Sequence, residues 1–455
     1  MPRSLTAALL ATLCGLTAAA TDAAEYNLTP SAKAGQAYQV EVQLKVGGDL
    51  TVRDLDAAPA TQKEGEEQAE GPVRKLPMSV EGRLAYEEAP LAEKQTARHY
   101  SVAMATIKVG DGGKTPNLTD GRRLVVAEQT PQGVKLACPN GPLTREQLDL
   151  IDVVGGTPFL DGLLPGESLP EGKAWAVDGE VMGALLGLDS VSVCEISNVI
   201  DEGTAGYVKF QVAGVVHGEV EGATTEFDIR GLGLFDRHAS CVTRLNLAIK
   251  EKRSLGPATP GFVGVAKINI KRDPISKPEF LIADALAAAK GQTDANLVLP
   301  SQDLGFEFQH DRSWFVASAG GPRVSLRRMH EGALVAQATI TRLPSKAGVE
   351  PSLKQFEADV RSSIGGAFSE LISAGEWTNQ AGCGCLGVIA RGKVDDIELE
   401  HRHYLVRSPG DGRTVSLVVT LAAGDLAAVA DADKLLADAA RPLGSAVAQK
   451  ATNKK

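Results

Sequence analysis

The stretch YQVEVQLKV, residues 38–46, alternates apolar and polar side chains without interruption. Successive side chains of a β-strand point to opposite faces, so this pattern is typical of a strand with one buried face. It predicts that Val40, Val42 and Leu44 lie in a core and that the residues between them face outward. We therefore expect the first half of the chain to be built on β-sheet.

Several later segments repeat the alternation and predict a meander of about nine strands. They are residues 79–88, 98–109, 206–220, 224–236, 242–253 and 261–272. Two short helices are predicted between strands: Thr144 and Gln147 form a capping box that favours a helix over 144–151, and 180–188 is a second candidate. A meander of this length cannot leave a long edge and an apolar face exposed. We expect a strongly curved sheet or half-barrel over residues 25–272, with the helices packed in its mouth.

The first 24 residues have the three-part pattern of a secretory signal peptide. Arg3 gives a positive start, residues 5–16 are uncharged and largely apolar, and the alanines at 18–20 offer a cleavage site. The apolar run is shorter than the roughly 20 residues that span a bilayer, and no later segment predicts a transmembrane helix. We expect residues 1–24 to be removed and the mature chain to be exported to the periplasm or beyond.

The outline of the first half resembles the open barrel of envelope lipid carriers such as LolA. The resemblance is carried by the order of the elements, by the predicted export and by GKAW at residues 172–175. It implies a hollow for an acyl chain or another apolar ligand. Such a hollow needs inward-facing apolar positions such as Val40, Val42 and Leu84.

A linker is predicted over residues 273–299, because prolines lie at its start and one follows its end. It divides the mature chain into a domain over 25–272 and a second domain over 300–445. Residues 446–455 are predicted to be a flexible tail.

The second domain is predicted to contain two hairpins, a helix, a three-stranded antiparallel meander and a closing helix. In chain order these span residues 304–316, 323–343, 352–364, 385–422 and 426–440. Ser352 and Gln355 form a capping box at the start of the first helix, and Phe356 and Val360 lie on one of its faces. The predicted fold class of the whole chain is therefore α+β, a curved antiparallel sheet followed by a second antiparallel sheet packed by helices.

This second domain resembles the PsbP/DcrB superfamily, an antiparallel sheet with helices packed on it. The resemblance is carried by FEFQHDRSWFV at 306–316, LKQFEADV at 353–360, HYLVRSPGDGRTVSLVVTLA at 403–422 and the closing helix. Such domains serve as assembly or interaction modules in several envelopes, which implies a binding role rather than catalysis.

Composition and motifs exclude some functions. The net charge is −10 and aromatic residues are only 4% of the chain, so neither a basic field for phosphates nor a stacking surface for bases is indicated. We expect no nucleic-acid partner. The sequence holds no G-x-S-x-G, P-loop or H-E-x-x-H motif. His238 beside Asp236 is interpreted as a polar residue at a strand end rather than as an acid–base pair.

The one candidate chemical site is formed by two spaced pairs. Cys383 and Cys385 lie one residue apart, as do His401 and His403, and residues two apart on a strand share a face. If the turn between the strands centres near Val394, Cys385 faces His401 or His403. Two thiolates and two imidazoles are a ligand set for Zn²⁺ and also suit Cu⁺.

Two other interpretations of these pairs remain open. Cys383 and Cys385 could form a redox pair. Alternatively, both pairs belong to ordinary strands, because His401 and His403 share their predicted face with Leu405, which indicates packing against a helix. We favour this last interpretation and expect no bound metal.

These observations favour an exported, soluble protein with a non-catalytic binding or interaction role and no cofactor. Its partner is expected to be a protein or an apolar ligand of the cell envelope. Two alternatives are a carrier of an acyl chain or other apolar ligand in the half-barrel, and a thiol- or metal-dependent activity at Cys383, Cys385, His401 and His403.

Overall fold

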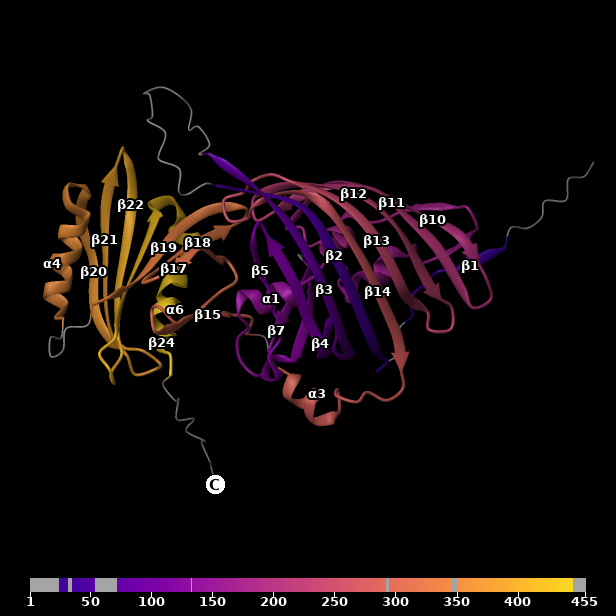
Figure 1. Ribbon diagram of the computed structural model, residues 1–455, viewed down its shortest axis with the longest axis horizontal. Helices are drawn as coiled ribbons and strands as arrows, with labels where there is room; N and C mark the ends of the chain where they lie inside the picture. The colour runs from indigo at the N-terminus through magenta and orange to yellow at the C-terminus, as the bar shows by residue number, and fades with distance from the viewer. Residues whose placement is uncertain are drawn as a thin grey trace, which may run out of the picture.

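The computed structural model describes residues 24–31, 35–53, 72–131, 133–291, 294–344 and 351–444. They form two lobes that lie side by side, each built on antiparallel sheet (Figure 1). The predicted signal peptide and tail lie outside the described residues, apart from one residue at the inner edge of the signal peptide. Among the described helices none is long and apolar enough to cross a membrane.

The first lobe is a curved antiparallel sheet of twelve strands. Its spatial order is β7-β6-β4-β3-β2-β14-β13-β12-β11-β10-β9, and the short β5 pairs with β4. The long strands are β2 Ala37–Arg53, β3 Val73–Ala92, β4 Gln95–Val109, β10 Ser190–Gly203, β11 Tyr207–Val220, β12 Ala223–Asp236, β13 Cys241–Arg253 and β14 Gly261–Ile275. The short strands are β5 Gly112–Lys114, β6 Leu124–Thr130, β7 Gly133–Ala137 and β9 Ala174–Ala176, and β1 Glu25–Asn27 pairs separately with β8 Ser168–Pro170.

The alternation in β2 predicts its faces correctly. Val40 and Val42 are buried, Leu44 is half-buried, and Gln43 is exposed between them. The strand β10 was not predicted, because its inward face includes a polar residue. Asn198 is buried and its side-chain amide donates a hydrogen bond to the carbonyl of Leu163 at 2.9 Å. A polar residue that is satisfied inside the core hides the apolar pattern of the strand that carries it.

Two α-helices and a 3₁₀ helix pack on the concave face of this sheet and complete the first core. They are α1 Arg145–Ile151, α2 Gly179–Leu186 and η2 Thr157–Leu163. The predicted capping box of α1 is present: the Thr144 hydroxyl accepts the N–H of Gln147, and the Gln147 side chain accepts the N–H of Thr144, both at 3.1 Å. This cap fixes where α1 begins, and α1 is the element that closes the hollow described below.

The segment predicted to be a linker is attached to the first lobe. The buried carboxylate of Glu87 on β3 accepts the N–H groups of Glu279, Phe280 and Leu281 at 2.6, 2.8 and 3.0 Å. The helix that follows, α3 Ala283–Ala289, packs through its last residue against apolar side chains of the same lobe. One acidic side chain therefore holds a segment almost two hundred positions away.

Replacement of Glu87 by alanine is expected to release this segment, because three consecutive N–H groups would lose their acceptor. We expect limited proteolysis to cut the variant within residues 276–296 at least about tenfold faster than the wild type, since cleavage follows the population of the open form. Glu81→Ala is the matched control: Glu81 lies on the same strand and forms an exposed ion pair with Lys45 at 3.4 Å. Equal cleavage rates for both variants would show that Glu87 does not secure the segment.

The second lobe contains a seven-stranded antiparallel sheet in the order β17-β18-β19-β23-β22-β21-β20. Its strands are β17 Trp314–Gly320, β18 Arg323–His330, β19 Ala333–Leu343, β20 Phe368–Thr378, β21 Gly384–Val394, β22 Ile397–Arg407 and β23 Thr414–Ala422. A small sheet of β15 Leu297–Ser301, β16 Phe306–His310 and β24 Arg441–Pro442 lies beside it. The helix α4 Leu353–Ile364 begins at Ser352 as predicted, with the serine hydroxyl accepting the N–H of Gln355 at 3.3 Å.

The hairpin predicted over residues 304–316 is not formed. β16 pairs with β15 and β24, whereas β17 pairs with β18, so the two strands belong to different sheets. Asp311 directs the chain between them: its carboxylate accepts the N–H of Ser313 and binds the Arg328 guanidinium at 2.8 and 2.6 Å. This contact draws the start of β17 toward β18 and away from β16.

The predicted closing helix is divided into α5 Leu426–Val429 and α6 Ala432–Asp438. At the break, Ala430 has a φ of 45°, and its carbonyl accepts a hydrogen bond from Arg402 at 2.6 Å. A φ of 45° lies outside the α-helical range, so the helix cannot continue through Ala430. The break between α5 and α6 therefore allows α6 to change direction and to pack its buried face against the sheet.

Direct contacts join the two lobes. The Arg145 guanidinium of α1 donates to the carbonyl of Arg312 at 2.6 Å and lies over the ring of Phe315, with 4.5 Å to its centroid. The N–H of Val298 donates to the carbonyl of Leu143 at 2.9 Å. The lobes are thus fixed to each other at α1, next to the hollow of the half-barrel.

Candidate functional site

The two cysteines and two histidines lie on neighbouring strands, but in a different register from the predicted one. The turn between β21 and β22 is Asp395–Asp396, where both residues have positive φ angles of 48° and 67°. Cys385 consequently lies opposite Val406, and His403 lies opposite Val388. The prediction that Cys385 faces a histidine is wrong, because the turn lies further along the chain than Val394.

This register separates the cysteines from the histidines. Cys385 lies on the face of the sheet that carries Tyr404 and Val406, and this face packs in the core with Trp314. A strand that slips by an odd number of residues turns its side chains to the other face. The four side chains therefore cannot converge on one ion, and the described residues contain no group of three or more potential ligands arranged for a metal.

The environment of the two thiols also disfavours thiolate formation, on which redox chemistry and metal binding depend. Cys383 and Cys385 are buried, and burial raises the pKa of Cys383 to about 11 and that of Cys385 to about 12. The thiolate is the nucleophile and the metal ligand, so these groups are protonated and unreactive at neutral pH. Neither the redox interpretation nor the metal interpretation gains support from this geometry.

The histidines face the helix α4. The sequence predicted this packing because His401 and His403 share their face of the strand with the apolar Leu405. Leu405, Val388 and Phe356 form a small core between α4 and the strands β21 and β22. Burial, with a contribution from His401, lowers the pKa of His403 to about 4, so its imidazole is neutral at physiological pH. We interpret both histidines as parts of the packing under α4.

A buried ionic network in the same lobe was not predicted. Asp433 on α6 is fully buried, binds the Arg402 guanidinium at 2.6 Å and accepts the hydroxyl of Tyr404 at 2.5 Å. Arg402 also binds Glu400 at 2.8 Å. These groups satisfy one another and join α6 to β22, which makes the network structural. Sequence reasoning missed it because Asp433 and Arg402 are far apart in the chain.

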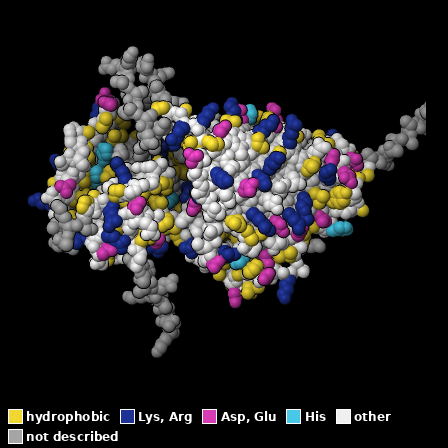
Figure 2. Space-filling model, in the orientation of Figure 1, with side chains coloured by type: hydrophobic (Ala, Val, Ile, Leu, Met, Phe, Trp, Pro, Cys, Tyr) yellow, Lys and Arg dark blue, Asp and Glu magenta, His cyan; other side chains and the backbone are white. Residues whose placement is uncertain are grey.

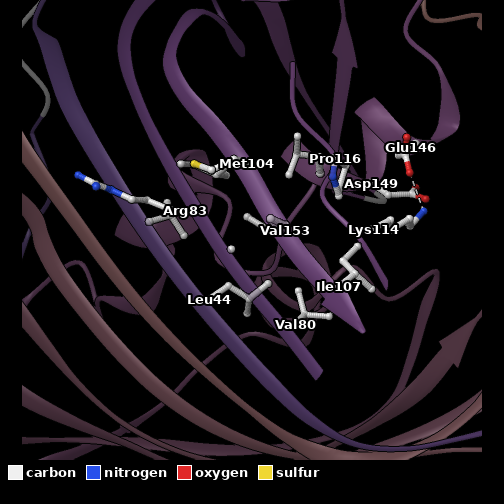
Figure 3. A pocket seen from close by; sticks show the side chains of 15 residues that line it. Leu44, Val80, Arg83, Met104, Ile107, Lys114, Pro116, Glu146, Asp149 and Val153 are labelled. Carbon is white, nitrogen blue, oxygen red and sulfur yellow. Dashed lines mark ion pairs between the residues drawn. The ribbon is translucent and has the colours of Figure 1, made fainter. Parts of the chain in front are cut away.

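The hollow of the half-barrel is the strongest candidate for a binding site. It is an apolar cavity of about 110 Å³ between the concave face of the sheet and α1 (Figure 3). From the strands it is lined by Val42, Leu44, Val80, Leu84, Ala105 and Ile107, and from α1 and the residues after it by Leu150 and Val153. Two of the three positions named from the sequence, Val42 and Leu84, are among these, whereas Val40 is not.

The cavity arises from two small residues that lie side by side. Gly82 on β3 pairs directly with Ala105 on β4, and Gly82 also pairs with Leu44 on β2. A methyl group added at Gly82 would make ordinary van der Waals contacts with Leu44 and Ala105, the nearest at 3.6 Å, so no neighbour occupies the place that a side chain would take. The larger apolar side chains around this pair form the walls.

Charged groups lie along one side of the cavity. Lys114 on β5 and Glu146 on α1 form an ion pair at 2.7 Å, and Asp149 lies beside them (Figure 3). The Arg83 side chain points away from the cavity in the same view. The site therefore combines an apolar interior with a mixed-charge rim, which is the usual composition of a small-molecule pocket.

Asp149 at this rim has an unusual environment. Its side chain is open to water in the hollow, but the surrounding protein raises the pKa of its carboxyl to about 6. The upward direction means that the rim loses negative charge at mildly acidic pH.

A second buried ion pair supports the sheet near the cavity. Arg98 on β4 donates to Glu88 on β3 at 2.8 Å and to the Thr157 hydroxyl of η2 at 3.0 Å. All three side chains are buried, so the strands and η2 are held in one arrangement. A preformed hollow needs such a rigid frame, because a loosely held wall collapses into an empty space.

No family model matches this chain, and no curated protein matches it. Among solved structures, cyanobacterial PsbP from Synechocystis sp. PCC 6803 is 14% identical with a TM-score of 0.26, and 34% of this chain covers 95% of that one. The Ran-binding protein Mog1p of Saccharomyces cerevisiae is 11% identical with a TM-score of 0.25, over 33% of this chain and 96% of that one. A structure of lipovitellin is 10% identical with a TM-score of 0.33, over 56% of this chain and 27% of that one.

These matches are consistent with a PsbP-like region. The resemblance of the first half to LolA-like carriers has no support from these structures. The low identities and TM-scores leave function to be argued from the site alone.

Proposed function

We propose that this chain is an exported, non-catalytic binding protein of the cell envelope, and that it holds the apolar end of a small amphiphilic ligand in the half-barrel cavity. The proposal rests on one observation, the apolar cavity between α1 and the strands β2, β3 and β4. Its other elements, export and the absence of catalysis, rest on the sequence pattern of residues 1–24 and on the protonated state of the buried thiols.

The size of the cavity limits the ligand. An apolar cavity of about 150 Å³ in another protein stays dry and binds benzene. The cavity here, at about 110 Å³, is somewhat smaller, so it suits the last few carbons of an acyl chain or a small ring rather than a whole lipid. Burial of about five methylene groups is worth roughly 4 kcal/mol, which corresponds to a dissociation constant near 1 mM for that part alone. A tighter ligand must gain further contacts outside the cavity.

The rim suggests where the polar part of such a ligand lies. Lys114 and Glu146 neutralise each other across the opening, and Asp149 is next to them. A polar group placed there can exchange hydrogen bonds with these side chains while its apolar end stays buried. This arrangement favours the carrier interpretation over the thiol- or metal-dependent one, whose four residues lie on opposite faces of a sheet.

The test fills the cavity. Ala105→Leu adds bulk at the floor and Gly82→Val adds it on the paired strand, so we expect each to weaken binding of a fluorescent medium-chain fatty acid at least about tenfold. Ala248→Leu, at an exposed position of β13, is the matched control and should bind like the wild type. The two substitutions are made in separate variants on neighbouring strands, so if one variant misfolds the other still decides the test.

The proposal is wrong if the wild type does not bind the probe at up to about 1 mM. It is equally wrong if both cavity variants fold normally, as judged by circular dichroism, and bind as well as the control. If the proposal is right, native mass spectrometry of each protein purified from its own envelope should show a bound amphiphile in the wild type and in the control, but in neither cavity variant.

A further inference from the structure

The two lobes meet along a furrow that is separate from the half-barrel cavity. One wall is the loop 255–260 together with the end of β2, and the other is formed by β17, β18 and β19. This part encloses about 500 Å³. A second hollow of about 610 Å³ shares Gln337 and Thr339 with it and continues across β23 to β22. We call these two adjoining hollows together the inter-lobe groove.

The floor of the inter-lobe groove is a part of the seven-stranded sheet that no described helix covers. The helix α4 packs on the same sheet, but over β20 and β21. Beyond it, half-exposed positions such as Ser325, Thr339 and Thr420 present hydroxyl groups. Hydroxyl groups both donate and accept hydrogen bonds, so such a floor can bind the N–H and C=O groups of an extended backbone.

The charge of the inter-lobe groove has one sign. Arg53, Arg323 and Arg327 line it, and Asp425 at its far end is the one acidic residue among the lining side chains. In the described part of the chain none of the three arginines forms an ion pair with a carboxylate, and Arg327 donates to the carbonyl of Pro257 at 2.5 Å. A local excess of positive charge on a protein with a net charge of −10 is selective for an anionic partner.

An apolar patch lies at one end of the groove. Phe315 on β17 lines the first hollow together with Leu255 and Pro257 of the half-barrel loop. Phe315 is half-buried, so part of its ring is open to a partner. Figure 2 shows Lys and Arg side chains scattered over both lobes on the face in view.

We propose that the inter-lobe groove binds an acidic, extended segment of another polypeptide, with an apolar side chain of that segment between Phe315 and Pro257. The length of the groove and its hydroxyl-lined floor suit an extended backbone, and the arginines suit its acidic side chains. The partner segment is therefore acidic, about as long as the groove, and carries at least one apolar residue.

The test uses a fluorescein-labelled peptide of eight residues that alternates glutamate and valine, with full-length protein and fluorescence anisotropy. The double variant Arg53→Glu/Arg323→Glu reverses two exposed charges that have no described partner, and we expect it to bind the peptide at least about tenfold more weakly. Raising the salt from about 20 mM to about 500 mM should also weaken binding to the wild type, because exposed charges are screened.

The matched control is Arg230→Glu/Lys267→Glu, which makes the same change of charge at exposed positions of β12 and β14 and should bind like the wild type. The proposal is overturned if the wild type does not bind the glutamate–valine peptide, or binds a lysine–valine peptide as well. It is also overturned if the two double variants behave alike, or if anionic phospholipid vesicles, and not the peptide, require Arg53 and Arg323.

Discussion

Asp433→Ala is expected to lower the free energy of unfolding of the second lobe by about 3 kcal/mol or more. Asp433 is fully buried and binds both Arg402 and the hydroxyl of Tyr404. Its removal leaves the Arg402 guanidinium inside the protein with Glu400 as its one remaining carboxylate among the described residues. The cost is the penalty for an incompletely paired buried charge, which exceeds the value of the original contact.

Urea unfolding followed by circular dichroism measures this effect, with Glu370→Ala as the matched control. Glu370 on β20 also forms an ion pair, with Arg391 at 2.9 Å, but its side chain is 56% exposed. Exposed ion pairs contribute about 0–1 kcal/mol, so the control should unfold almost like the wild type. Similar midpoints for the two variants would contradict the assignment of Asp433 to a network that stabilises the lobe.

Val42→Asp is expected to destabilise the half-barrel by several kcal/mol and to abolish binding of an apolar probe. Val42 is buried and lies between Leu84 of β3 and Ile270 of β14, its direct neighbours across the sheet. A carboxylate at this position either remains charged in an apolar wall or takes up a proton. Both outcomes cost free energy, and both place a polar group where the proposed ligand would lie.

Gln43→Asp is the matched control, because it introduces the same side chain one position along β2, on the exposed face. Surface substitutions away from special features usually change stability by less than about 0.5 kcal/mol. The comparison therefore isolates the face of the strand. If both variants unfold at the same urea concentration, the assignment of the two faces of β2 is wrong.

Local patterns in the sequence predicted the elements whose signals lie within one strand or one helical turn. The alternation around Val42 gave the buried face of β2 correctly, and the capping box at Thr144 and the Ser352 cap gave the starts of two helices, although the Gln355 side chain binds Asp359 and does not complete the predicted box at Ser352. These features depend on side-chain periodicity and on hydrogen bonds between residues three apart. Nothing distant in the chain is needed to form them, which is why they were visible in the sequence.

The register of β21 and β22 could not be predicted from the sequence. The candidate metal site depended on that register, so its geometry could not be predicted either. The turn at Asp395–Asp396 shifts Cys385 to a position opposite Val406 and places the histidines on the other face. The cavity was predicted only in part: the sequence indicated Val42 and Leu84, but the space itself depends on Gly82 lying opposite Ala105. A pairing between two strands has no local signature in either of them.

The sequence by itself determined that the chain is rich in antiparallel β-structure, where its well-patterned strands and capped helices lie, and which face of β2 is buried. The tertiary structure alone decided that the segment after β14 is held by Glu87, that Asp433 meets Arg402, and that the strands around residues 304–316 enter different sheets. The physical reason is the range of the interactions. Periodicity and capping act within a few residues, whereas register, buried charge pairs and cavities arise only when distant segments come into contact.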